Sequence, residues 1–113
     1  MIKVEAIIQP SKLDEVKEAL ASLEIRGLTI LHVLEHSGRA GLKAVYRGGE
    51  YYVDVPKIKL EMVVSSPRAD EVIEAISHAA RAGMSDDDGT ILVYEIADAI
   101  RIRNGRRMGF ALL

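Results

Sequence analysis

The chain has 113 residues, with 15 lysines and arginines against 17 aspartates and glutamates, 49% hydrophobic residues and no cysteine. This length suits one domain with one core and leaves no room for separate catalytic and binding domains. Without cysteine there are no disulfides, thiolate zinc sites or cysteine nucleophiles, which fits a reducing cytoplasm. No apolar run reaches the ~18 residues of a membrane span, and a net charge of −2 argues against a nucleic-acid partner. We therefore expect one soluble, cytoplasmic domain.

The first third of the sequence predicts a strand, a helix and a second strand. Apolar and polar residues alternate over residues 2–8, as in a strand buried on one face. Ser11 stands three residues before Asp14 in a capping arrangement, and apolar residues then recur at helical spacing over residues 13–23. Residues 28–35 are rich in β-branched and aliphatic side chains, which favours a strand.

The same pattern recurs in the second half. Residues 57–64 alternate charged and apolar side chains, which indicates a strand. Ser66 and Pro67 provide an N-cap and a first-turn proline for a helix that runs to about Gly83, and residues 91–96 close the unit as a strand. Two such units predict an α+β, ferredoxin-like βαββαβ sandwich with both helices on one face of the sheet.

Between the two units lies a long segment, about residues 36–56, without clear periodicity. Loops of this length in compact domains are usually functional or disordered. The segment carries several charges and three of the four tyrosines, Tyr46, Tyr51 and Tyr52, a composition suited to a partner surface. The simpler interpretation is a floppy hairpin tip.

The chain resembles the PII signal-transduction family over nearly its whole length. The likeness rests on four blocks of sequence: EAIIQPSKLDEVKEAL at 5–20, RGLT at 26–29, YRGGEYYVDVPKIKLEMVV at 46–64 and IRIR at 100–103. The resemblance implies a single domain, 1–113, that assembles as a homotrimer. It also implies a T-loop at about 37–56, a B-loop at about 82–90 and a C-terminal segment at about 97–113.

By this resemblance the chain binds an adenine nucleotide, ADP, AMP or ATP, in clefts between subunits. The implied nucleotide-binding residues come from several elements, namely Ile7, Thr29, Gly38, Arg39, Val63, Asp88, Gly89, Arg101 and Arg103. The residues alone support part of this set, because a strand period of two would place both guanidinium groups of Arg101 and Arg103 on one face. Paired guanidiniums match the oxygens of a di- or triphosphate, whereas the alternative is a solvated strand edge.

Three positions depart from the family pattern. Asp87 and Thr90 replace a glycine and a phosphate-binding lysine of the B-loop, which favours AMP or ADP over ATP; on chemistry alone the acidic run is a solvated turn. Ala40 replaces a glutamine that helps to hold Mg-ATP and 2-oxoglutarate, which argues against 2-oxoglutarate sensing and leaves Mg²⁺ open. Lys57 matches a lysine aimed at 2-oxoglutarate, with a surface lysine as the alternative.

The T-loop residues Tyr46, Arg47 and Tyr51 are implied partner contacts. Tyr51 also matches a tyrosine that some relatives modify with a nucleotide, although a simple contact aromatic is the other interpretation. His32 and His36 lie too far apart along a strand to share a metal, and we expect no metal site. The basic tail, residues 101–107, could bind an anion or RNA, or pack across a subunit junction.

The leading hypothesis is a PII-like regulator that controls a membrane transporter or a metabolic enzyme through its T-loop in nitrogen regulation. The alternative is a divergent sensor of ADP or AMP linked to bicarbonate or another carrier, without 2-oxoglutarate sensing. In either case the cytoplasmic protein would be recruited peripherally to a membrane transporter. A structural or RNA-binding module is disfavoured because the tyrosines gather in the loop and not on the sheet. The sequence carries no recognisable enzyme motif, so we expect no catalysis.

Overall fold

The computed structural model describes residues 1–36, 42–46, 48–81 and 88–107. Along the chain its helices and strands are β1 (Ile2–Ile8), the 3₁₀ helix η1 (Pro10–Lys12), α1 (Leu13–Ser22), β2 (Thr29–Glu35), β3 (Leu42–Tyr46), β4 (Gly49–Val53), β5 (Val55–Val64), the 3₁₀ helix η3 (Ser66–Arg68), α2 (Ala69–Ala80) and β6 (Gly89–Glu95).

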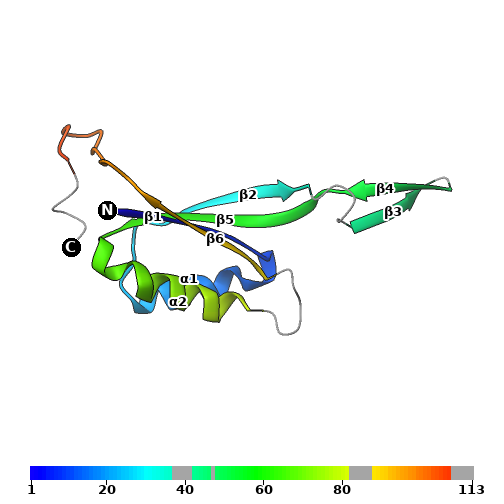
Figure 1. Cartoon of the computed structure of the whole chain (residues 1–113), viewed down its shortest axis with the longest axis horizontal. Helices are drawn as coiled ribbons and strands as arrows, with labels where there is room; N and C mark the ends of the chain where they lie inside the picture. Colours follow the sequence, from blue (N-terminus) through cyan, green and yellow to red (C-terminus); the bar gives the residue numbers. More distant parts are fainter. Residues whose placement is uncertain (37–41, 47, 82–87, 108–113) are drawn as a thin grey trace.

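Four of the strands form one antiparallel sheet in the order β2-β5-β1-β6. Both α1 and α2 lie against the same face of this sheet (Figure 1). This arrangement confirms the predicted α+β, ferredoxin-like fold, in which each helix connects an edge strand to a central strand.

The hydrophobic core lies between the sheet and the two helices. Alternate residues of the central strands point into it, because successive side chains of a strand face opposite sides. The two helices complete the core with residues at helical spacing. The buried apolar residues are Val4, Ala6, Ile8, Val16, Leu20, Ile58, Leu60, Met62, Val64, Ala69, Val72, Ile76 and Ala80.

The opposite face of the sheet carries a charged cluster. The Lys59 ammonium lies 2.5 Å from the carboxylate of Glu5, which is 6% exposed, and 3.5 Å from Glu61. Lys3 lies 3.7 Å from Glu61 and 5.5 Å from the centre of the Tyr94 ring. The hydrogen bond from Lys59 lowers the pKa of Glu5, and the same bond raises the pKa of Lys59. The pKa of Tyr94 is raised because its hydroxyl donates to Glu5.

The predicted helix caps at Ser11 and Ser66 were wrong. Both residues lie inside short 3₁₀ helices, and neither these helices nor α1 and α2 have a side-chain hydrogen bond at the N-cap. The proline in each 3₁₀ helix, Pro10 or Pro67, explains the difference, since its fixed φ starts a tight turn before the α-helix. The second helix ends at Ala80, and residues 82–87 lie outside the described part.

The long segment expected to lack regular structure contains a β-hairpin, β3–β4 (Figure 1). The hairpin projects beyond the ends of β2 and β5, and the long axis of the molecule reaches 58 Å. At its base, Nδ1 of His36 lies 2.6 Å from Oδ1 of Asp54. The strand β5 begins at Val55, two residues before the predicted start. The strand pairing was not predicted because the sequence of this segment has no clear alternation of apolar and polar residues.

The predicted strand containing Arg101 and Arg103 was also wrong. The Arg101 amide donates to the Arg106 carbonyl, and residues 102–104 form a turn closed by Gly105, whose φ is +67°. Arg107 is paired with Asp98, and the hydrogen bond from Arg107 lowers the pKa of Asp98. The two arginines therefore lie on a tight hairpin, and the period of two does not apply to them.

The connection between α1 and β2 holds a strained residue. Glu24 has a φ of 60°, in the left-handed region that costs a side chain with a Cβ about 1–2 kcal/mol. The amide of Glu24 donates to the Ala21 carbonyl, and the Ile25 amide donates to the Leu20 carbonyl, so the end of α1 imposes this conformation.

Replacing Glu24 with glycine should stabilise the protein by about 1 kcal/mol, because glycine adopts this backbone without strain. The midpoint of urea denaturation would measure the gain. Glu24→Ala is the matched control: it removes the same charge but keeps the Cβ. Equal midpoints for the two variants would show that the left-handed backbone carries no cost.

The Glu5–Lys59 pair should make stability depend on acid. Because the pKa of Glu5 is below its ordinary 4.5, its contribution is present above that value and disappears as the pH falls through the folded-state pKa. Glu5→Gln should therefore lower the midpoint of urea denaturation at pH 7. Near pH 3 the midpoints of the variant and of the unmodified protein should lie closer together. A difference of the same size at both pH values would contradict this assignment.

Candidate functional site

A cavity of about 970 Å³ lies where the α1–β2 connection meets the end of β5 and the C-terminal hairpin. Three residues from the predicted nucleotide set, Thr29, Val63 and Arg101, line it together. They come from β2, β5 and the hairpin after β6, which are far apart in the sequence. The fold therefore brings these three into one site.

The cavity has a surplus of cationic side chains. Its charged lining comprises Lys3, Arg26, Arg68 and Arg101 against Glu24 and Glu61. Lys3 is held by Glu61, while Arg68 donates to the Leu23 carbonyl and to Glu71. Within the described part of the chain, Arg26 and Arg101 make no side-chain hydrogen bond or ion pair. Two guanidinium groups are thus available to an anionic ligand.

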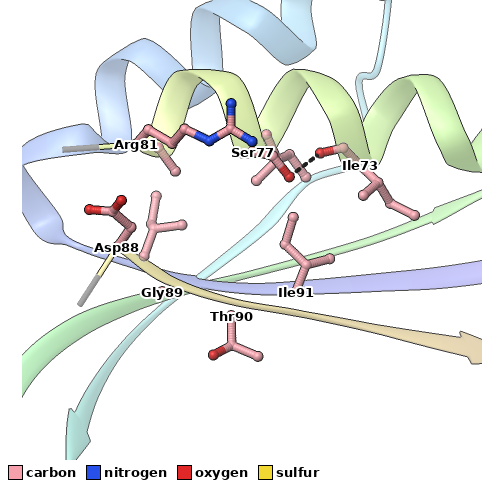
Figure 2. A pocket seen from close by; sticks show the side chains of 10 residues that line it. Ile73, Ser77, Arg81, Asp88, Gly89, Thr90 and Ile91 are labelled. Atoms are coloured by element: carbon pink, nitrogen blue, oxygen red, sulfur yellow. Dashed lines mark hydrogen bonds between the residues drawn. The ribbon is translucent and has the colours of Figure 1, made fainter. Parts of the chain in front are cut away.

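A second group of predicted residues lies where β6 begins. Gly89 has a φ of +119°, and a Cβ there would lie 2.0 Å from the Ile7 carbonyl oxygen, so this position requires glycine. Asp88 and Gly89 also line a cavity of about 310 Å³ under the end of α2 (Figure 2). The lining of this cavity includes the apolar side chains of Ile73 and Ile91. The Thr90 side chain points away from Ile91, to the charged face of the sheet (Figure 2).

One chain does not unite these two groups. Val63 pairs with Lys3 at the start of β1, whereas Ile7 near its end pairs with Thr90. Four strand residues span about 14 Å, so the Thr29–Val63–Arg101 group and the Ile7–Gly89 group occupy opposite ends of the sheet. Each group by itself contains only some of the predicted nucleotide-binding residues.

The other predicted residues have different outcomes. Arg103 lies in the exposed turn 102–104 and does not line either cavity. Gly38, Arg39 and Arg47 lie outside the described residues, and the strands of the hairpin contain Tyr46 and Tyr51.

Lys57 is not the surface lysine that was considered as an alternative. Its side chain is 3% exposed, in β5 opposite Val33. Lys57 is therefore largely shielded from bulk water, near the start of β5.

The sequence analysis missed Arg26 and Glu24. Both lie in the short connection before β2, and both line the larger cavity. Arg26 belongs to the RGLT block of the family resemblance, but a charged residue in a surface turn is common, so neither residue was distinguished as a cavity residue by its own sequence context. Their importance depends on where the C-terminal hairpin lies, which local sequence does not specify.

The described residues contain no cluster of three or more histidine, cysteine, aspartate or glutamate side chains that could hold a metal ion. None of their helices combines the length and the apolar character that a transmembrane helix requires.

The chain matches the family model described as Nitrogen regulatory protein P-II over residues 1–106. The Nitrogen regulatory protein P-II of Rhodospirillum rubrum is 47% identical over 113 residues, which cover 99% of this chain and 100% of that protein. That of Rhodobacter capsulatus is 51% identical over 106 residues, 93% of this chain and 94% of the relative. The solved structure of Arabidopsis thaliana PII bound to citrate superposes with a TM-score of 0.74 at 34% identity, covering 94% of this chain and 83% of that one. The chain therefore belongs to the P-II family of nitrogen regulatory proteins.

Proposed function

We propose that the chain is a regulator that binds an adenine nucleotide between the subunits of a homotrimer and thereby controls a transporter or enzyme through its T-loop. The observation that carries the proposal is the cationic cavity that gathers Thr29, Val63 and Arg101. Its volume accommodates a nucleotide, and its two available guanidiniums suit phosphate oxygens.

The separation of the two half-sites supports assembly. If the Arg101 end of one copy meets the Gly89 end of another, Thr29, Val63 and Arg101 of one copy would face Asp88 and Gly89 of the other across one ligand. The charged face of the sheet also exposes apolar side chains, with Leu31 37%, Leu92 42% and Tyr94 43% exposed. Covering these side chains with other copies adds buried area that a small domain needs.

In this proposal the β3–β4 hairpin contacts the target protein. Only Asp54 separates its second strand, β4, from β5, so a ligand that contacts the base of the hairpin in one conformation shifts the population toward that conformation. The pair formed by His36 and Asp54 lies at this base, where such a change would act. A target membrane protein or enzyme would then bind one conformation of the hairpin and release the other.

The same geometry favours ADP or AMP without 2-oxoglutarate. Lys57 is buried, and Thr90 provides no cation beside Ile7. The family relationship indicates regulation and not catalysis, and the nucleotide in this proposal is an effector whose bonds remain intact.

Isothermal titration should show binding of ADP or AMP, and Arg101→Gln should weaken ADP binding about tenfold, because a charge-assisted hydrogen bond contributes roughly 1.5–3 kcal/mol. Arg106→Gln is the matched control, since Arg106 lies on the same hairpin and does not line the cavity. Sedimentation equilibrium should give three times the 12.4 kDa chain mass. No heat with any adenine nucleotide would overturn the proposed function.

Restoring a cation at position 90 should change the preference among nucleotides. Thr90→Lys should tighten ATP binding more than AMP binding, because the added ammonium would face the terminal phosphates next to Ile7. Thr90→Gln adds length without charge and should leave the ratio of the two dissociation constants unchanged. An unchanged ratio in Thr90→Lys as well would mean that this end of the sheet does not meet phosphate.

A further inference from the structure

The connection between α1 and β2 presents an arginine to the larger cavity. Arg26 lines this cavity together with Thr29 and Arg101, and it is exposed to solvent. Lys3 and Arg68, the other cations of the lining, are engaged by Glu61 and by Glu71 with the Leu23 carbonyl. A ligand that enters the cavity therefore meets Arg26 as one of two guanidiniums without a competing partner in the described part of the chain.

The backbone beside Arg26 is constrained as well. Glu24, two residues earlier, holds a left-handed conformation at φ 60°, although it carries a Cβ. The amides of Glu24 and Ile25 are both bound to the end of α1, so the connection is anchored and the backbone of Arg26 starts from a fixed point.

We propose that Arg26 is a second anion-binding residue of this cavity, which holds the phosphate groups of a nucleoside diphosphate together with Arg101. This inference rests on the proposed nucleotide binding and extends it to a residue outside the predicted set. A guanidinium offers paired donors that match two phosphate oxygens, and two guanidiniums separate a diphosphate from a monophosphate by charge. In the proposed assembly, Arg26 of one copy would provide part of the positive charge that Thr90 of a neighbouring copy lacks.

The test is a titration of each variant with adenosine, AMP and ADP, which share one base and ribose and differ in phosphate charge. For Arg26→Gln we expect a dissociation constant for ADP about tenfold higher, a smaller increase for AMP and no change for adenosine. Lys17→Gln is the control, because Lys17 is an exposed cation on α1 that does not line the cavity. Arg26→Lys retains the charge but not the planar fork, so its ADP affinity should fall between the other two.

The outcomes separate this inference from the proposed function. If the unmodified protein binds ADP and Arg26→Gln binds it equally well, Arg26 is not an anion-binding residue, while nucleotide binding stands. An equal loss for adenosine and ADP would also overturn the inference, because it would show a general change in cavity shape. If the unmodified protein binds none of the three ligands, the proposed function fails first, and the role of Arg26 fails with it.

Discussion

The antiparallel pairing of β1 with β5 holds the rest of the structure in place. It runs without interruption from the pair Ile2–Val64 to the pair Ile8–Ile58. Every second residue of both strands contributes to the core under the helices, and the intervening residues form the charged face. The two cavities flank opposite ends of this ladder, so the length of the paired strands sets the distance between them.

The two faces of the sheet differ in the interactions that they make. The face under α1 and α2 provides stability through apolar burial, which needs no specific partner. The other face combines a nearly buried Glu5, its partner Lys59 and exposed apolar side chains. Such a surface suits contact with further copies of the chain, because the ion pairs are already satisfied internally and the apolar residues gain from being covered.

Much of the fold could be predicted from sequence because the spacing of apolar residues shows which face of a strand or helix is buried. The strands β1 and β5 and both helices have one buried face, and their apolar residues repeat accordingly. The β3–β4 hairpin shows no clear periodicity in its sequence and was not predicted. The hairpin at residues 100–107 was mistaken for a strand because its alternation of isoleucine and arginine is not accompanied by pairing beyond the bridge of Ile100 with Arg107.

The candidate site was predictable only in part, for a related reason. Thr29, Val63 and Arg101 were identified through resemblance, and their meeting in one cavity depends on tertiary contacts that no local pattern encodes. Arg26 lies in the RGLT block but was given no role there, and only its place in the lining of the larger cavity distinguishes it. Lys57 could be interpreted as a surface residue because strand alternation places it opposite the apolar core face, and alternation alone does not reveal that it is buried.

The central claim is that two chains complete one nucleotide site. The most direct measurement is a crystal structure of the protein grown with ADP. We expect an assembly in which one ADP contacts Arg101 of one copy and the Gly89 region of another. An ADP molecule held entirely by residues of a single copy, or an assembly that leaves the two cavities apart, would contradict it.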